Sequence, residues 1–176
     1  MLFWPSFTSA VVAPELGYLT VLNTVLALCG STLATYVFSK LIRGKIEVED
    51  IANAALAGGV CIGSTCSTAN PGFAMVIGIW PVPLSTLGFA IIAPKVCKLI
   101  RGTDTCGVHN LHGMPGLLGG LFGIAITGNV GVQVGAVVAT VVVGLVLGRV
   151  CGAILGLFGT KEVPYSDEGD FLLEEE

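Results

Sequence analysis

The residues best suited to chemistry lie together in the stretch 104–120, DTCGVHNLHGMPGLLGG. It contains Asp104 and both histidines of the chain, His109 and His112. Histidine changes its protonation state near neutral pH, so His112 could accept or pass on a proton. Asp104 would either cap the helix that follows it, by accepting hydrogen bonds from free N–H groups, or contact a substrate. The sequence leaves both roles of Asp104 open.

These residues do not form a catalytic or metal-binding set. Asp104, His109 and His112 stand at positions i, i+5 and i+8, which do not make one tight face of a helix. The six cysteines show neither a CxxC pair nor the spacing of a zinc site, and most of them lie in apolar runs. There a cysteine usually acts as a small hydrophobic residue. We therefore expect no enzyme activity, no cofactor and no metal.

The composition is that of an integral membrane protein. Of the 176 residues, 53% are hydrophobic and 11% are charged, and the mean hydropathy is +0.88. Soluble domains carry about 25% charged residues. The sequence therefore predicts a transmembrane domain over residues 1–160, with the lipid bilayer as its surroundings.

The last residues differ sharply from this domain. Seven of the twelve acidic residues follow residue 161. We expect residues 161–176 to form an acidic, solvated tail on the cytoplasmic side. Negative charge there argues against nucleic acid or anionic lipid as a partner.

Five segments predict an all-α bundle of about five transmembrane helices, since about 20 mostly apolar residues cross the hydrocarbon core. These segments are 17–39, 51–71, 72–94, 107–128 and 131–158. The second is built from small, weakly polar residues, and Pro81 and Pro83 predict a break in the third. Residues 1–13 look like the end of a further helix.

The positions of the basic residues predict the orientation of the bundle. Basic residues occur between the first and second segments, between the third and fourth, and after the fifth: Lys40, Arg43, Lys45, Lys95, Lys98, Arg101 and Lys161. The alternate loops near 13–16, 69–72 and 128–131 contain no Lys or Arg. The positive-inside rule then places the C-terminus in the cytoplasm. Arg149 is the exception, because it lies within the last apolar segment and either reaches to the interface or pairs inside the bundle.

With this orientation His112 lies well inside the membrane. It follows Asp104 by eight residues, about 12 Å along an α-helix, while the hydrocarbon core is about 30 Å thick. An ionisable residue at that depth is a candidate for a functional site. A histidine that only bonds to a neighbouring helix would fit the same position. His109 is nearer the interface and fits a structural role better.

Glycines predict close helix packing in three segments. Gly144, Gly148, Gly152 and Gly156 recur every four residues, which is the spacing of a helix-packing stripe in membranes. Gly58, Gly59 and Gly63 lie in the second segment, and the fourth segment is also rich in glycine. Packing within a bundle or between subunits is the expectation for all of these stripes.

Four stretches, in order along the chain, resemble the Rhesus (Rh) glycoprotein branch of the ammonium transporter superfamily. FWPSFTSA at 3–10 resembles the family's outer-gate segment, and residues 22–63 resemble its next two spans. STLGF at 85–89 resembles the span before the histidine motif, which DTCGVHNLHGMPGLLGG resembles. Together these matches spread over much of the chain, so the resemblance is specific.

The resemblance implies a homotrimer in the plasma membrane, with one narrow apolar path in each subunit. Two stacked histidines line that path and a pair of phenylalanines gates it. By position, His112 matches the second histidine, Phe7 the second, outer-gate phenylalanine, and Asp104 the acidic residue near the cytoplasmic mouth. Thr8 stands where the family usually has Asn. The implied function is transport of ammonia or ammonium, with carbon dioxide as a further candidate.

The family fold consists of two inverted five-helix repeats with the path between them. The chain resembles the second repeat only, from the last turns of its first helix. We therefore expect it to be part of a longer Rh-type protein that also contains the N-terminal repeat. The alternative is a truncated, non-conducting membrane subunit that assembles with full-length relatives through its glycine faces. In that case His112 would be a buried polar contact.

Overall fold

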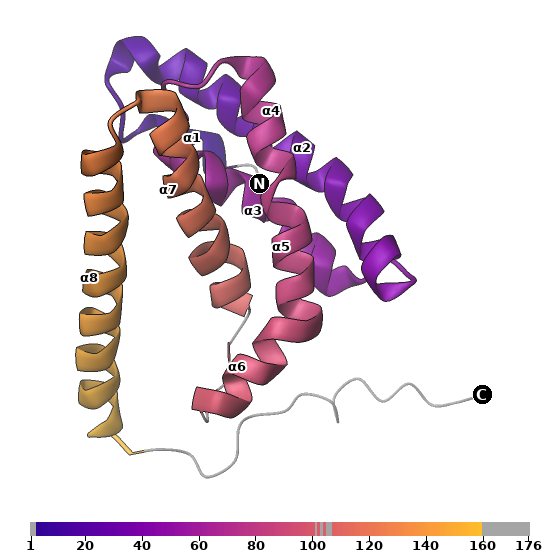
Figure 1. Cartoon of the computed structure of the whole chain (residues 1–176), viewed down its shortest axis with the longest axis vertical. Helices are drawn as coiled ribbons and strands as arrows, with labels where there is room; N and C mark the ends of the chain where they lie inside the picture. Colours follow the sequence, from indigo (N-terminus) through magenta and orange to yellow (C-terminus); the bar gives the residue numbers. More distant parts are fainter. Residues whose placement is uncertain (1–2, 101, 103, 105–106, 160–176) are drawn as a thin grey trace. The chain divides into compact units, whose positions relative to one another are not determined.

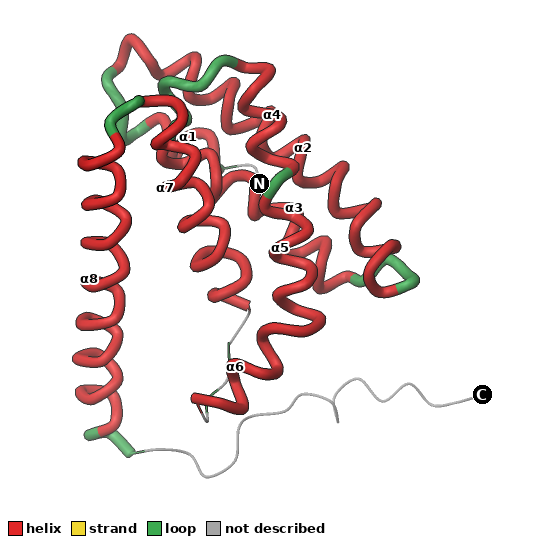
Figure 2. Tube along the Cα trace, in the orientation of Figure 1, coloured by secondary structure: helices red, strands yellow, loops and turns green. Residues whose placement is uncertain are grey.

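The computed structural model of the protein describes residues 3–100, 102, 104 and 107–159, and its regular elements over that part of the chain are all helices (Figure 2). The all-α expectation is confirmed for these residues. They belong to two compact units, one ending at Val137 and the other beginning at Val138. The expected acidic tail at 161–176 lies outside the described residues, as do Arg101 and Lys161.

The order of the elements is labelled in Figure 1. They are α1 (Trp4–Ser9), the 3-10 helix η1 (Pro14–Leu16), α2 (Gly17–Arg43), α3 (Val48–Cys61), the 3-10 helix η2 (Ile62–Ser64), α4 (Pro71–Ile79), α5 (Pro81–Leu87), the π-helical turn η3 (Gly88–Ile92), α6 (Ala93–Ile100), the π-helical turn η5 (His109–Gly113), α7 (Met114–Thr127) and α8 (Val130–Gly156).

Three of the five expected spans are long and apolar enough by themselves to cross a membrane: Pro14–Arg43, Pro71–Leu99 and Val130–Gly156. The other two are shorter, because α3 and α7 have 14 residues each. A polar turn that follows η2 ends the second segment, and the π-helical turn η5 precedes α7 in the fourth. The predicted break in the third segment lies at Trp80, where α4 ends and α5 begins, but Trp80 itself keeps helical backbone angles (φ −58°, ψ −40°).

Helix α2 forms the centre of the first unit and packs against α1, α3, α4 and α5. Its neighbour α4 runs beside it in Figure 1. The helix ends at Gly44, which adopts a left-handed conformation (φ 78°) and donates its N–H to the Lys40 carbonyl. Lys40 and Arg43 in the last turn complement the negative end of the helix dipole.

Glycines allow the helices around α2 to approach closely. A side chain at Gly58 on α3 or at Gly78 on α4 would overlap the Ala27 carbonyl of α2. A side chain at Gly119 on α7 would overlap the backbone of Cys61 on α3. The prediction of close helix packing is confirmed for Gly58 and Gly119.

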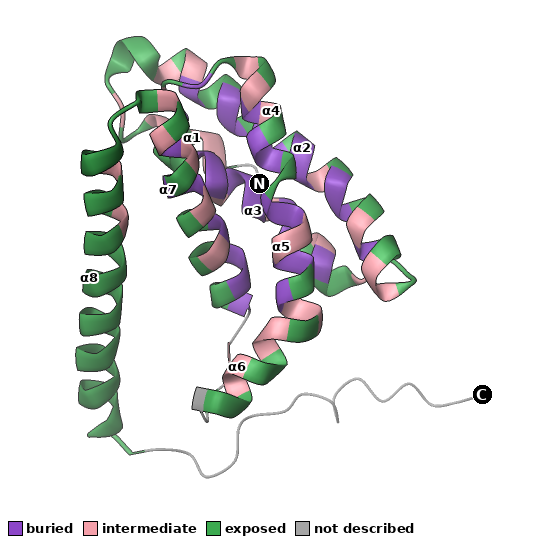
Figure 3. Cartoon of the chain, viewed as in Figure 1, coloured by how far each residue is buried: buried purple, intermediate pink, exposed green. Residues whose placement is uncertain are grey.

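The interior of this unit is unusually polar. Buried residues, purple in Figure 3, gather on α2, α3, α4 and α5, and those of α2 include Asn23, Thr24, Ser31 and Thr35. Asn23 Nδ2 donates to the carbonyls of Cys66 (2.9 Å) and Ala69 (2.7 Å), which fixes the turn before α4. Helices that meet lipid have to bond their polar side chains inward, because hydrocarbon offers no partners.

The second unit begins within α8, an uninterrupted 27-residue helix with no buried residue. It is apolar on every side, which is the pattern of a helix surrounded by lipid or by other helices. Gly144, Gly148, Gly152 and Gly156 have open space where a side chain would stand. What packs on this stripe stays a prediction.

Candidate functional site

Phe7 and His112 line the same open groove, which has a volume of about 710 Å³. The groove is formed by α1, by the C-terminal end of α3 with η2, and by the turn η5. Its lining residues are Phe3, Trp4, Phe7, Thr8, Gly59, Val60, Gly63 and His112. Except for Thr8 and the imidazole, this lining is apolar or aromatic. The structure therefore brings together two of the three residues that the sequence singled out.

Trp4 is the residue of this groove that sequence reasoning missed. Its ring stacks on the imidazole of His112, with centroids 6.2 Å apart and planes within 12° of each other. The Trp4 ring also lies against α3, where a side chain at Gly59 would come within 3.0–3.1 Å of the indole. The aromatic residues of FWPSF were visible in the sequence, but no spacing connected them to a histidine more than 100 residues later.

Thr8 anchors α1 rather than facing the groove alone. Its side chain is buried, and its hydroxyl oxygen lies 2.8 Å from that of Thr24 on α2. The Thr24 hydroxyl also donates to the Thr20 carbonyl at 2.7 Å. This contact fixes the short helix that carries Trp4 and Phe7.

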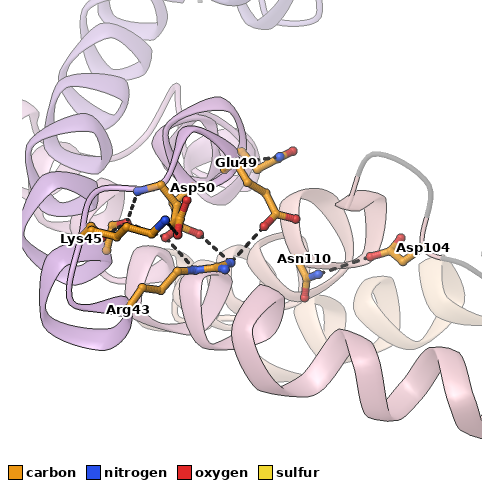
Figure 4. Close-up of polar contacts among 9 residues, drawn as sticks. Arg43, Lys45, Glu49, Asp50, Asp104 and Asn110 are labelled. Atoms are coloured by element: carbon orange, nitrogen blue, oxygen red, sulfur yellow. Dashed lines mark hydrogen bonds and ion pairs between the residues drawn. The ribbon is translucent and has the colours of Figure 1, made fainter. Parts of the chain in front are cut away.

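Asp104 lies at a second, inner pocket with a volume of about 460 Å³. Its Oδ1 accepts the backbone N–H of His109 at 3.0 Å, and its Oδ2 accepts from Asn110 Nδ2 at 3.3 Å. Figure 4 shows the second of these bonds. Glu49, Asn53, Phe89, Cys97 and Asn110 also line this pocket. Asp104 is therefore bonded to the start of η5 and is not in the groove of His112.

The π-helical turn η5 carries residues of both spaces. Asn110 lines the inner pocket and His112 lines the outer groove. π-helical turns insert one extra residue into a helix and are frequent at functional sites. The side chain of His109, the first residue of the turn, is exposed.

A buried ion network joins α2 and α3 near the inner pocket (Figure 4). The Asp50 side chain is 0% exposed; its Oδ2 accepts from Ser39 Oγ at 2.6 Å and lies 3.2 Å from Arg43 Nε. Arg43 also pairs with Glu49 at 3.1 Å. Sequence reasoning missed Asp50, because a carboxylate in the first turn of a helix usually faces solvent.

The groove is suited to binding and passage of a small molecule rather than to covalent chemistry. Within the described residues no group of three His, Cys, Asp or Glu side chains could hold a metal ion. The five described cysteines are free: Cys29, Cys61, Cys66, Cys97 and Cys151. An imidazole can both donate and accept hydrogen bonds, and aromatic faces attract cations and cover apolar groups.

Comparison with known proteins decides the family. The sequence model described as the Ammonium Transporter Family matches residues 1–168. The chain belongs to the ammonium transporter family. Its members are transporters, and the Rh resemblance is confirmed by relatives of that type. Ammonium transporter Rh type B of Papio hamadryas is 44% identical over 131 residues, and the Homo sapiens protein of that name is 43% identical over 131 residues.

A solved structure supports the same assignment of the fold. The Rh50 protein of Nitrosomonas europaea, described with the Rhesus protein family of channels, superposes with a TM-score of 0.88 and is 47% identical. The match covers 97% of this ammonium transporter family member and 46% of the Rh50 chain. The matches to the two Rh type B proteins cover 72% of this chain and 29% of each relative. The chain thus spans less than half the length of these proteins.

Proposed function

We propose that the chain forms one wall of a path by which ammonia or ammonium crosses the membrane. His112 lies in the path, Phe7 belongs to the outer gate, and Asp104 lies near the cytoplasmic mouth. The observation that carries this proposal is that Phe7 and His112 line one apolar groove, although they come from opposite ends of the first unit. The names of the Rh relatives supply the substrate.

The lining of the groove fits a small neutral amine better than an ion. An unpaired charge at the bilayer centre costs at least about 2.5–3.5 kcal/mol. Ammonia avoids most of that cost, and the His112 imidazole could donate or accept one hydrogen bond with it. The same apolar lining would admit carbon dioxide, which we keep as a finer part of the proposal.

The groove is open, so the path needs a second wall. Phe3 is 78% exposed and Phe7 is 69% exposed, which is unfavourable for two aromatic rings that face water or lipid in an assembled transporter. We propose that an N-terminal repeat of the inverted-repeat fold covers them. In its complete form the protein is a homotrimer in the plasma membrane, with its C-terminus in the cytoplasm.

One observation favours a second function. The glycine stripe of α8 has open space around it, so this face is free to pack on another protein within the described part of the chain. A non-conducting subunit would use such a face to assemble with full-length relatives. The intact mass of the native product decides between the two functions: a mass at least twice 18.0 kDa favours the transporter, and a mass near 18.0 kDa favours the subunit.

The proposal is tested by flux measurements on the complete product of the gene, reconstituted in vesicles. We expect an ammonium gradient to change the internal pH, and His112→Ala to slow that change several-fold. His109→Ala is the matched control, because His109 is exposed and should leave the flux close to the parent rate. Equal flux in the parent and in His112→Ala, at equal protein density, would remove His112 from the path.

A further inference from the structure

The two π-helical turns of the first unit meet at one point. Gly88 begins η3, and Asn110 is the second residue of η5. A side chain on Gly88 would overlap Asn110 Oδ1, and its Cβ would lie 3.0 Å from Asn110 Cγ. Only glycine at position 88 therefore leaves room for the Asn110 carboxamide.

The Asn110 side chain is held on both sides. It is 0% exposed, and its Nδ2 donates to the Asp104 carboxylate at 3.3 Å. Its Oδ1 has no hydrogen-bond partner among the described residues and faces Gly88. A buried amide oxygen without a partner is costly, so a reason other than helix stability is needed for its retention here.

The register of η5 decides where His112 points. A π-helical turn contains one residue more than an α-helical turn, and each residue of an α-helix rotates the chain by about 100°. If the turn reverted to α-helical bonding, His112 would rotate relative to Asp104 and leave the stack with Trp4. The Asp104 carboxylate bonds the N–H of His109 at the start of the turn, and the Asn110 carboxamide bonds the same carboxylate.

We infer that Asn110 is a positioning residue for His112, and that Gly88 provides the space that this requires. The carboxamide locks the π-helical register of residues 109–113 against α5 and η3. The His112 imidazole is then directed onto Trp4 and into the groove. The role of His112 in flux rests on the proposed function, whereas the geometry of the His112–Trp4 stack does not.

The stack can be measured in the chain itself, because Trp4 and Trp80 are its two tryptophans. In a Trp80→Phe background, Trp4 emission reports on His112 alone. We expect His112→Ala to change this emission, since the stacked imidazole is removed. In chains that carry Asn110→Ala, the same His112→Ala exchange should no longer change it. A change as large as in the parent would overturn the inference, and so would no change in the parent.

Gly88→Ala tests the inference from the opposite side of the contact. Its methyl group would displace the carboxamide, so it should abolish the response of Trp4 emission to His112→Ala, as Asn110→Ala does. The double variant should be no more severe than either single variant. Gly116→Ala is the matched control on α7, because the nearest atom to its new methyl is Val60 Cγ1 at 3.8 Å. A folded Gly88→Ala chain, by circular dichroism, that keeps the parent response would contradict the inference.

Selectivity separates a positioning role from a general loss of structure. In the complete gene product, Asn110→Ala and Gly88→Ala should change the ratio of ammonium to methylammonium flux several-fold, in the direction seen with His112→Ala. Fluxes that fall in equal proportion for both substrates would indicate a structural role only and overturn the inference. If the unsubstituted protein carries no ammonium, the proposed function fails, and the emission measurement still decides the role of Asn110.

Discussion

The indole of Trp4 stacks on the imidazole of His112, with 6.2 Å between ring centroids and 12° between ring planes. This contact joins the start of the chain to its histidine motif across the face of α3. It also limits the rotation of the one imidazole in the groove, so that its two nitrogens have a defined direction. The contact therefore relates the fold of the first unit to the proposed path.

Replacing Trp4 should affect flux without affecting the bundle. In the complete gene product we expect Trp4→Leu to lower ammonium flux several-fold, because His112 loses its stacking partner and the groove loses its largest side chain. The ring is only part of the groove lining, so the amount of protein in the membrane should not change. Trp80→Leu is the matched control, since Trp80 is 60% exposed and lies edge-on to Phe122. A flux loss equal to that of the control would contradict the role of the stack.

Removing the Asp50 carboxylate should destabilise the first unit strongly. Asp50→Ala leaves the partly buried Arg43 guanidinium and the Ser39 hydroxyl without their partner. Breaking a buried pair in this way costs about 3–5 kcal/mol. Glu49→Ala, at a side chain that is 54% exposed, should cost about 1 kcal/mol or less. Reversible unfolding in mixed micelles measures both variants, and equal costs would show that the buried pair has no special weight.

A single methyl group at Gly58 should separate α2 from α3. Its Cβ would overlap the Ala27 carbonyl and lie 2.7 Å from Ser31 Oγ, and backbone cannot move aside as a flexible side chain can. Overpacking of this kind costs about 1–3 kcal/mol. Gly116→Ala should instead be neutral or stabilising, by up to about 1 kcal/mol of helix propensity. Thermal midpoints of the two variants check this, and a stable Gly58→Ala protein would refute the close contact.

Much of the bundle could be predicted from the sequence because lipid imposes simple rules. The five segments and their boundaries follow from apolar length, and close packing at Gly58 follows from small-residue spacing. Grouping Phe7 with His112 required the resemblance to a family, because the two residues lie far apart in the chain. The groove then brought them together.

The missed residues share a physical reason. Trp4, Gly88, Asn110 and Asp50 act through contacts between distant elements, and local periodicity carries no trace of such contacts. Neither π-helical turn was visible either, since a one-residue change of bonding leaves the apolar pattern almost intact. Pro81 was read correctly as the end of α-helical bonding, but Trp80 stays helical, because proline tolerates the first turn of a new helix.

The central claim is that the groove of Phe7 and His112 is the wall of the path, and thiol modification at Val60 tests it most directly. Val60 lines the groove and has no assigned chemical role. In the complete gene product, with its native cysteines replaced, Val60→Cys should conduct ammonium until methanethiosulfonate ethylammonium is added, and then lose most of its flux. Leu121→Cys is the control, because Leu121 is 55% exposed on α7, outside the groove lining. Block at position 60 and not at position 121 is the predicted result; a fully labelled Val60→Cys protein that still conducts at its starting rate would contradict the account.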